Sequence, residues 1–246
     1  MGILEGGVEK ERSLPYPFAH PAAVLPLARP MGRFAVPSAL AIGSIAPDLW
    51  YLVPGLARHD THGAFAALWF CLPAGLLAYL AFHLLLKQPL LALLSPRLGA
   101  FACRGLPAAA WPAVMASLLA GALTHLAWDA ATHAFEDAWR HNWVQHASTA
   151  TGTAVLAWWI SRKLRGAPAA ASPVSSFSRT CVLICLAGAM MISALWSADR
   201  WLAPDAAALR HFARTAGVAA LQGLAAALLL FSLLYCLLFQ RKIKPL

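Results

Sequence analysis

Two histidines and an aspartate follow one another at steps of four in the segment THLAWDAATHAF, residues 124–135. Such steps place His125, Asp129 and His133 on one stripe of an α-helix. A histidine and an aspartate one turn apart can both reach the same zinc ion. The three positions span about 12 Å along the axis, which predicts one ion shared with other segments, or two ions with Asp129 between them. The alternative is a buried hydrogen-bonded network that holds helices together.

Two carboxylates lie in stretches that are otherwise apolar. The chain has ten acidic residues, and only Asp48 and Asp129 fall inside such stretches. A charged side chain at membrane depth costs at least about 2.5–3.5 kcal/mol. A cation, a protonated partner or a metal ion must therefore offset each charge, although Asp48 has the alternative role of capping the helix that follows it.

Further imidazoles and a carboxylate come from the first quarter of the sequence. His20 lies in the segment FAHP, and His59, Asp60 and His62 lie in the segment ARHDTHG. We interpret His62 and His20 as partners of the helical stripe, whereas His59 has the alternative of a loop residue that pairs with Asp60.

The elements that position these residues are predicted to be membrane-spanning helices. Hydrophobic residues make up 60% of the 246 residues and charged residues 12%, against about 25% charged in an ordinary soluble domain. Apolar runs long enough to cross a bilayer recur along the chain. The sequence predicts six spans, at Val36–Val53, Ala64–Leu86, Ala110–Trp128, Val144–Ile160, Cys181–Ala198 and Thr215–Phe239.

The basic residues orient these spans. With six crossings, fourteen Lys and Arg residues fall on the side of the termini and five on the other, so both termini are predicted to be cytoplasmic. The proposed ligands then lie at the non-cytoplasmic end, except His20. Three alternatives remain for it: residues 17–35 re-enter the membrane, Val36–Val53 does not cross, or His20 is not a ligand.

The organisation expected is a single integral membrane domain, all-α and polytopic, over residues 1–246. It comprises a polar tail (1–16), a core with the metal site (17–160), a linker (161–180) and two further spans (181–246). The net charge of +9 is scattered among short loops, and this argues against nucleic acid, which needs a clustered basic face. The expected partner is the lipid bilayer.

Four segments resemble the DUF4184 family of bacterial membrane proteins. They are PFAHPAAVLPL (17–27), ALAIGSIAPDLWYL (39–52), THG with FCLPAGLLAYLAFHLLLKQPL (61–63 and 70–90), and GALTHLAWDAATH (121–133). The resemblance implies a multi-pass protein of the bacterial cytoplasmic membrane.

The order of the polar groups is also distantly similar to the superfamily of zinc-dependent phospholipase C and P1 nuclease. That similarity implies the ligand set His20, Asp48, His62, His125, Asp129 and His133. The superfamily's last ligand pair has no counterpart, because Gln145 follows His141 and Ala150 follows His146 at the required step. One or two zinc ions are therefore expected.

The function expected is a membrane-embedded zinc hydrolase of phosphodiesters or esters, including lipid-like ones. Asp48 and Asp129 would be ligands with catalytic roles, one of them doubling as general base. The alternative is a non-catalytic proton or ion carrier, or an assembly factor, whose buried Asp and His groups titrate or pair.

Overall fold

The computed structural model is helical throughout the residues that it describes, which are 17–53, 55–63, 65–94, 110–133, 138–165, 174–198 and 206–239. None of these residues forms a strand, so the all-α prediction is confirmed for the described part of the chain. The chain divides into two compact units. Unit 1 comprises Met1–Asp48, Ala57–Leu76 and Ala109–Ser161, and unit 2 comprises Leu49–Leu56, Leu77–Ala108 and Arg162–Leu246. The single-domain organisation stays a prediction.

Unit 1 contains every element that carries a predicted ligand. Its elements are η1 (Pro17–Ala22), η2 (Leu25–Leu27), α1 (Ala28–Met31), η3 (Gly32–Phe34), α2 (Pro37–Gly43), the start of η4 (Ala46–Leu52), α3 (Arg58–Thr61), η5 (Ala67–Cys71), the first half of α4 (Leu72–Ala81), α6 (Trp111–His133) and most of α7 (Ala138–Leu164). The main packing contact joins α2 to α6.

Glycine allows α2 and α6 to approach at backbone distance. A Cβ atom on Gly43 would collide with the backbone of Leu118, and one on Gly121 would collide with the backbone of Leu40 and Ser44. Pro37 starts α2 at a position where its missing N–H costs nothing. The Ser117 hydroxyl accepts from the Val36 N–H at 2.9 Å and donates to the Phe34 carbonyl at 2.7 Å. These contacts fix the register of α2 along α6.

The segment before α2 and the segment containing α2 form a hairpin along α6. The His20 ring stacks on His125, near the end of α6, whereas Phe34 contacts Ser117, near its beginning. From there the chain returns parallel to α6, so that the Ser44 carbonyl again meets His125. His20 thus comes back to the same end of α6 as the other predicted ligands.

Val36–Val53 is not one membrane-length helix. It is divided into α2, with seven residues, and the 3-10 helix η4, also with seven. Pro47 lies in the first turn of η4, where it cannot donate the hydrogen bond that would continue α2. This break is what allows the hairpin to bring Asp48 beside α6.

Helix α7 packs antiparallel against α6. Gln145 bonds to Thr132, and the Trp128 indole donates to Ser148, so positions later in α7 meet earlier positions in α6. One turn further, a Cβ on Gly152 would lie 2.9 Å from the Ala19 carbonyl oxygen. α7 includes the predicted span Val144–Ile160, but it does not meet the apolar criterion that the membrane-length helices below satisfy.

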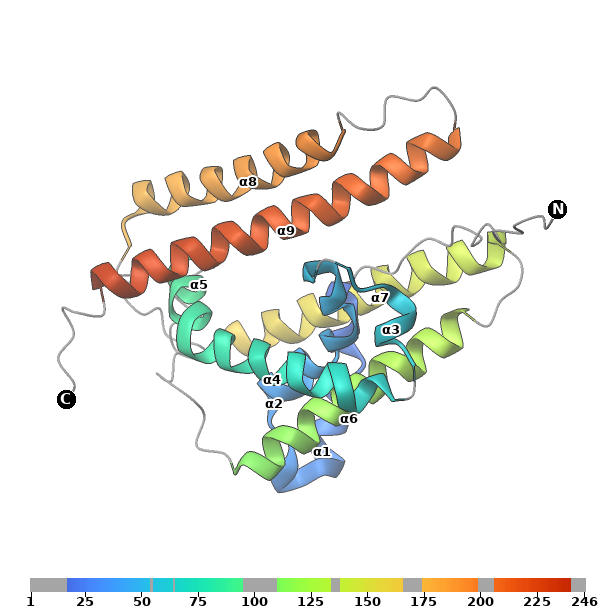
Figure 1. The fold of residues 1–246 in the computed structure, drawn as a ribbon. Helices are drawn as coiled ribbons and strands as arrows, with labels where there is room; N and C mark the ends of the chain where they lie inside the picture. Colours follow the sequence, from blue (N-terminus) through green and yellow to red (C-terminus); the bar gives the residue numbers. More distant parts are fainter. Residues whose placement is uncertain are drawn as a thin grey trace. The chain divides into compact units, whose positions relative to one another are not determined.

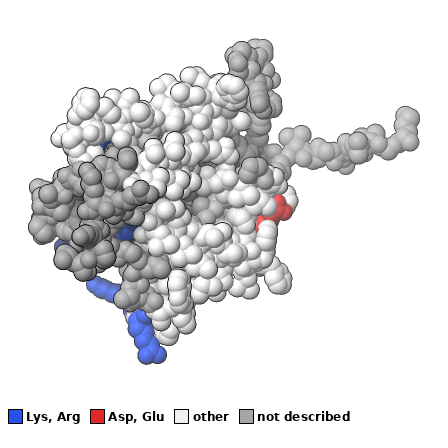
Figure 2. Space-filling model, turned by 60° about the vertical axis from the view of Figure 1, so that its left-hand side comes forward, with Lys and Arg blue, Asp and Glu red and all other residues white. Residues whose placement is uncertain are grey.

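Four described helices are long and apolar enough to cross a membrane: Ala67–Leu93, Trp111–Thr132, Ser176–Trp196 and Thr215–Leu237. The first is a continuous helix built from η5, α4, η6 (Phe82–Leu86) and α5 (Lys87–Leu94). In unit 2, α8 (Ser176–Ala198) and α9 (Ala206–Phe239) form an antiparallel pair (Figure 1). Few charged side chains appear among the described residues on the face shown in Figure 2. A membrane protein is therefore supported, and four of the predicted spans correspond to these helices.

Candidate metal centre

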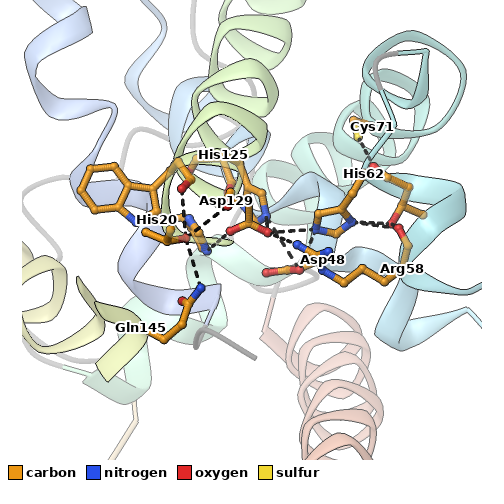
Figure 3. Close-up of polar contacts among 12 residues, drawn as sticks. His20, Asp48, Arg58, His62, Cys71, His125, Asp129 and Gln145 are labelled. Carbon is orange, nitrogen blue, oxygen red and sulfur yellow. Dashed lines mark hydrogen bonds and ion pairs between the residues drawn. The ribbon is translucent and has the colours of Figure 1, made fainter. Parts of the chain in front are cut away.

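Five of the six predicted ligands meet in unit 1. His20, Asp48, His62, His125 and Asp129 point toward one another from η1, η4, the end of α3 and α6 (Figure 3). Their side chains are 9% exposed or less. Donors of this type buried together need either protons or a cation among them.

The two histidines nearest the carboxylates are oriented through their Nδ1 atoms. His125 Nδ1 donates to the Ser44 carbonyl at 2.7 Å, and His62 Nδ1 lies 3.1 Å from the Arg58 carbonyl oxygen and 2.9 Å from the Thr61 hydroxyl. A carbonyl can only accept, so the proton of a neutral His125 ring is on Nδ1. The Nε2 atoms of both rings face the carboxylates. Backbone carbonyls orient metal-binding histidines in this way.

The distances among these atoms fit ligands around an ion better than direct hydrogen bonds. His62 Nε2 lies 3.6 Å from Asp48 Oδ1 and 3.5 Å from Asp129 Oδ2. His125 Nε2 lies 3.9 Å from Asp48 Oδ1 and 3.6 Å from Asp129 Oδ2. Neighbouring ligand atoms on a tetrahedral zinc ion are about 3.3 Å apart. The Nε2 atoms of His62 and His125 and Oδ2 of Asp48 are buried without a hydrogen-bond partner.

Two overlapping groups of three ligands could each hold an ion. One is His20, Asp48 and His125, and the other is His62, His125 and Asp129. Within each group the ligand atoms lie within 4.8 Å of one another. Two imidazoles and one carboxylate are a common ligand set for zinc in hydrolytic sites, with a fourth position left open. His125 belongs to both groups, so it is the residue on which any ion depends most.

His20 is present as a neutral imidazole. Its ring stacks on that of His125, with the centroids 3.8 Å apart. Burial, and next the neighbouring His125, lower the pKa of His20 to about 4. The ring is therefore uncharged at neutral pH and its nitrogens can act as ligands.

Arg58 supplies a cation at the edge of the cluster. One of its guanidinium nitrogens is at hydrogen-bonding distance from Asp129 Oδ2, and its side chain is 33% exposed. Asp129 is thus an anion held by a permanent positive charge. α3, which Arg58 begins, is capped by Asp60, whose Oδ2 accepts from the Ala57 N–H at 2.9 Å.

Polar residues behind Asp129 hold the end of α6. Buried Gln145 donates to the Thr132 hydroxyl at 3.1 Å, and Thr132 bonds to the carbonyls of Trp128 and Asp129. The Gln145 side chain therefore supports α6 through Thr132 (Figure 3).

Three further residues were expected at or near the cluster or lie beside it: His133, His59 and Arg58. The side chain of His133 lies outside the described residues, so its role as a ligand stays a prediction. His59 is 78% exposed and pairs with Asp60 at 3.2 Å, as its alternative predicts, but it lies within α3 and not in a loop. The sequence predicts Arg58 only as one of the five basic residues on the side opposite the termini. The signal for it was a lone arginine directly before the histidines and aspartate of ARHDTHG.

Comparison with known proteins gives one match. The model of the family described as "Domain of unknown function (DUF4184)" matches residues 14–233. No curated protein and no solved structure matches the chain. The matched range includes all five residues of the cluster and the greater part of both units, so the chain belongs to the DUF4184 family.

Proposed function

We propose that the protein is a membrane-embedded, zinc-dependent hydrolase whose site is formed by His20, Asp48, His62, His125 and Asp129. The observation that carries the proposal is the pair of buried Nε2 atoms, of His62 and His125, that face two carboxylates at 3.5–3.9 Å. A lone pair repels a carboxylate unless a cation or a proton lies between them. The distant similarity to the zinc-dependent phospholipase C and P1 nuclease superfamily points the same way.

The zinc ion and the two carboxylates would have different roles in hydrolysis. Zinc in such a site acts as a Lewis acid on the scissile phosphoryl or carbonyl oxygen and activates water near neutral pH. Asp129 is already engaged by Arg58, whereas Oδ2 of Asp48 is buried without a hydrogen-bond partner. Asp48 is thus the better general base, since it can accept a proton from the attacking water. Both carboxylates keep the roles predicted from the sequence.

The decisive experiment is elemental analysis of the detergent-purified wild-type protein together with a hydrolysis assay. One or two zinc ions per chain are expected, and hydrolysis of bis(p-nitrophenyl) phosphate is expected to stop on removal of the metal by a chelator and to resume when zinc is restored. Protein free of transition metal, or protein that carries iron in place of zinc, would contradict the proposal.

The same geometry favours one alternative. If the imidazoles are doubly protonated, the distances describe ion pairs, and the cluster is a titrating network of a proton or ion carrier. Metal-free protein that gives pH-dependent flux in liposomes, with no hydrolysis, would support this alternative.

The site is proposed to face the non-cytoplasmic side. Residues 17–48 would form a re-entrant hairpin entering from the site end of α6, and α7 would be a fifth crossing, antiparallel to α6. The end opposite the site, together with the turn of the hairpin, then holds twelve basic residues and the site end seven, counting the tail. The twelve are Arg29, Arg33, Lys87, Arg97, Arg104, Arg162, Lys163, Arg165, Arg179, Arg241, Lys242 and Lys244. The C-terminus would be cytoplasmic and the N-terminal tail would lie at the site end, unlike the six-span arrangement.

Labelling with a membrane-impermeant maleimide tests this orientation. In a variant whose native cysteines are replaced, His59→Cys is expected to react in intact spheroplasts, because this side chain is exposed beside the site. A variant retaining only Cys103, between the first two membrane-length helices, is expected to react after lysis only. The reverse pattern would place the site in the cytoplasm.

A further inference from the structure

We infer that Arg58 is the anchor for a phosphate group of the substrate, and that the site therefore acts on phosphate esters rather than on neutral carboxylic esters. This inference rests on the proposed zinc site. It concerns a residue outside the predicted ligand set, and it selects one of the two substrate classes that the ligand set leaves open.

Arg58 lies at the more exposed edge of the cluster. Its side chain is one-third exposed, whereas His20, Asp48, His62, His125 and Asp129 are each buried. A ligand that approaches the buried nitrogens from this side must pass the guanidinium. The cluster has no other cationic side chain among the contacts of the described residues.

The Arg58 guanidinium has more N–H donors than its contact with Asp129 uses. Arginine has five N–H donors in a planar fork, and one of them is directed at Asp129 Oδ2. Phosphate oxygens are acceptors that match this fork in geometry as well as in charge. A neutral ester carbonyl would use one donor at most.

The location of Arg58 fits a phosphate at the surface of a bilayer. α3 precedes the membrane-length helix Ala67–Leu93 by a short loop, and Phe65, Leu68 and Trp69 at the beginning of that helix are exposed. Exposed aromatic and aliphatic side chains next to an arginine are typical of the interface, where lipid phosphates lie. A lipid headgroup and a soluble phosphate ester have the same chemistry at this point.

The test compares Arg58→Gln with the matched control Arg33→Gln, which removes an exposed arginine that lies over the Phe34 ring. Binding of inorganic phosphate to zinc-loaded protein in detergent is measured by titration calorimetry, and zinc content is measured on the same samples. Arg58→Gln is expected to keep its zinc and to bind phosphate about tenfold more weakly or worse, as the loss of a charge-assisted hydrogen bond implies. The phosphate affinity of Arg58→Lys is expected to lie between those of the wild type and Arg58→Gln. The affinity of Arg33→Gln is expected to match that of the wild type.

Three results would overturn the inference. Unchanged phosphate binding in Arg58→Gln would remove the anchor but leave the zinc hydrolase standing. Loss of zinc from Arg58→Gln would show that the arginine serves Asp129 and not a ligand. Wild-type protein without zinc would end the proposed function and this inference with it.

The source of the phosphate is distinguished by two substrates. Bis(p-nitrophenyl) phosphate is compared with vesicles of phosphatidylglycerol and phosphatidylcholine, each with wild type and Arg58→Gln. If Arg58→Gln loses turnover of the soluble ester alone, of the lipid alone or of both, the result supports the anchor. It also identifies which phosphate Arg58 binds. Equal turnover by both proteins on both substrates contradicts it.

Discussion

Replacing His125 with alanine is expected to reduce the zinc content of the purified protein to background. His125 belongs to both groups of three ligands, so its loss leaves neither complete. The effect should exceed the ~10- to 100-fold loss of affinity that follows removal of a partner that only orients a ligand. Zinc is measured by elemental analysis after dialysis against metal-free buffer.

His59→Ala is the matched control for this variant. It also removes one imidazole, but from an exposed side chain that pairs with Asp60 outside the cluster. Its zinc content should equal that of the wild type. Thermal unfolding in detergent shows whether His125→Ala remains folded, since it also loses the bond to the Ser44 carbonyl. A folded His125→Ala variant with full zinc would contradict the proposed centre.

Replacing Asp48 with asparagine is expected to lower hydrolysis of bis(p-nitrophenyl) phosphate by ~10²- to 10⁴-fold, the usual contribution of a general base. Asparagine keeps the shape of the side chain but cannot accept the proton of the attacking water. The group of His62, His125 and Asp129 remains intact, so at least one zinc ion should be retained. Initial rates are compared at matched zinc content.

Asp60→Asn is the control for the carboxylate. Asparagine can still accept the hydrogen bond from the Ala57 N–H, so α3 should keep its cap and the rate should not change. A wild-type rate in Asp48→Asn would show that Asp48 has no role as a base. Complete loss of zinc from Asp48→Asn would show that the carboxylate acts mainly as a ligand.

The residues of the cluster were predictable because their chemistry conflicts with their surroundings. Asp48 and Asp129 are carboxylates in apolar sequence, and His125 precedes Asp129 by one turn. Both signals depend only on composition and helical period, which are local properties of the chain. The helical class and four of the spans depend on long apolar runs in the same way.

The position of His20 could not be predicted in this way. The six-span prediction places His20 at the opposite side of the membrane from the other predicted ligands, because Val36–Val53 has the length of a span. The structure divides this segment at Ser44 and Ile45, and the chain runs along α6 and back. Two glycines, Gly43 and Gly121, allow α2 to lie against the α6 backbone. A close approach of two helices depends on pairs of residues far apart in the sequence, which no local pattern encodes.

The sequence by itself determined a helical membrane protein and most of the groups that could bind a metal ion. Hydropathy and side-chain chemistry depend only on which residue stands at each position. The tertiary structure decided which nitrogen of His62 and His125 faces the carboxylates, that His20 joins them, and that Arg58 pairs with Asp129. These features arise from carbonyls and side chains brought together by packing. Their partners lie far apart in the chain, by 81 residues for His125 and Ser44, and only the folded chain brings them into contact.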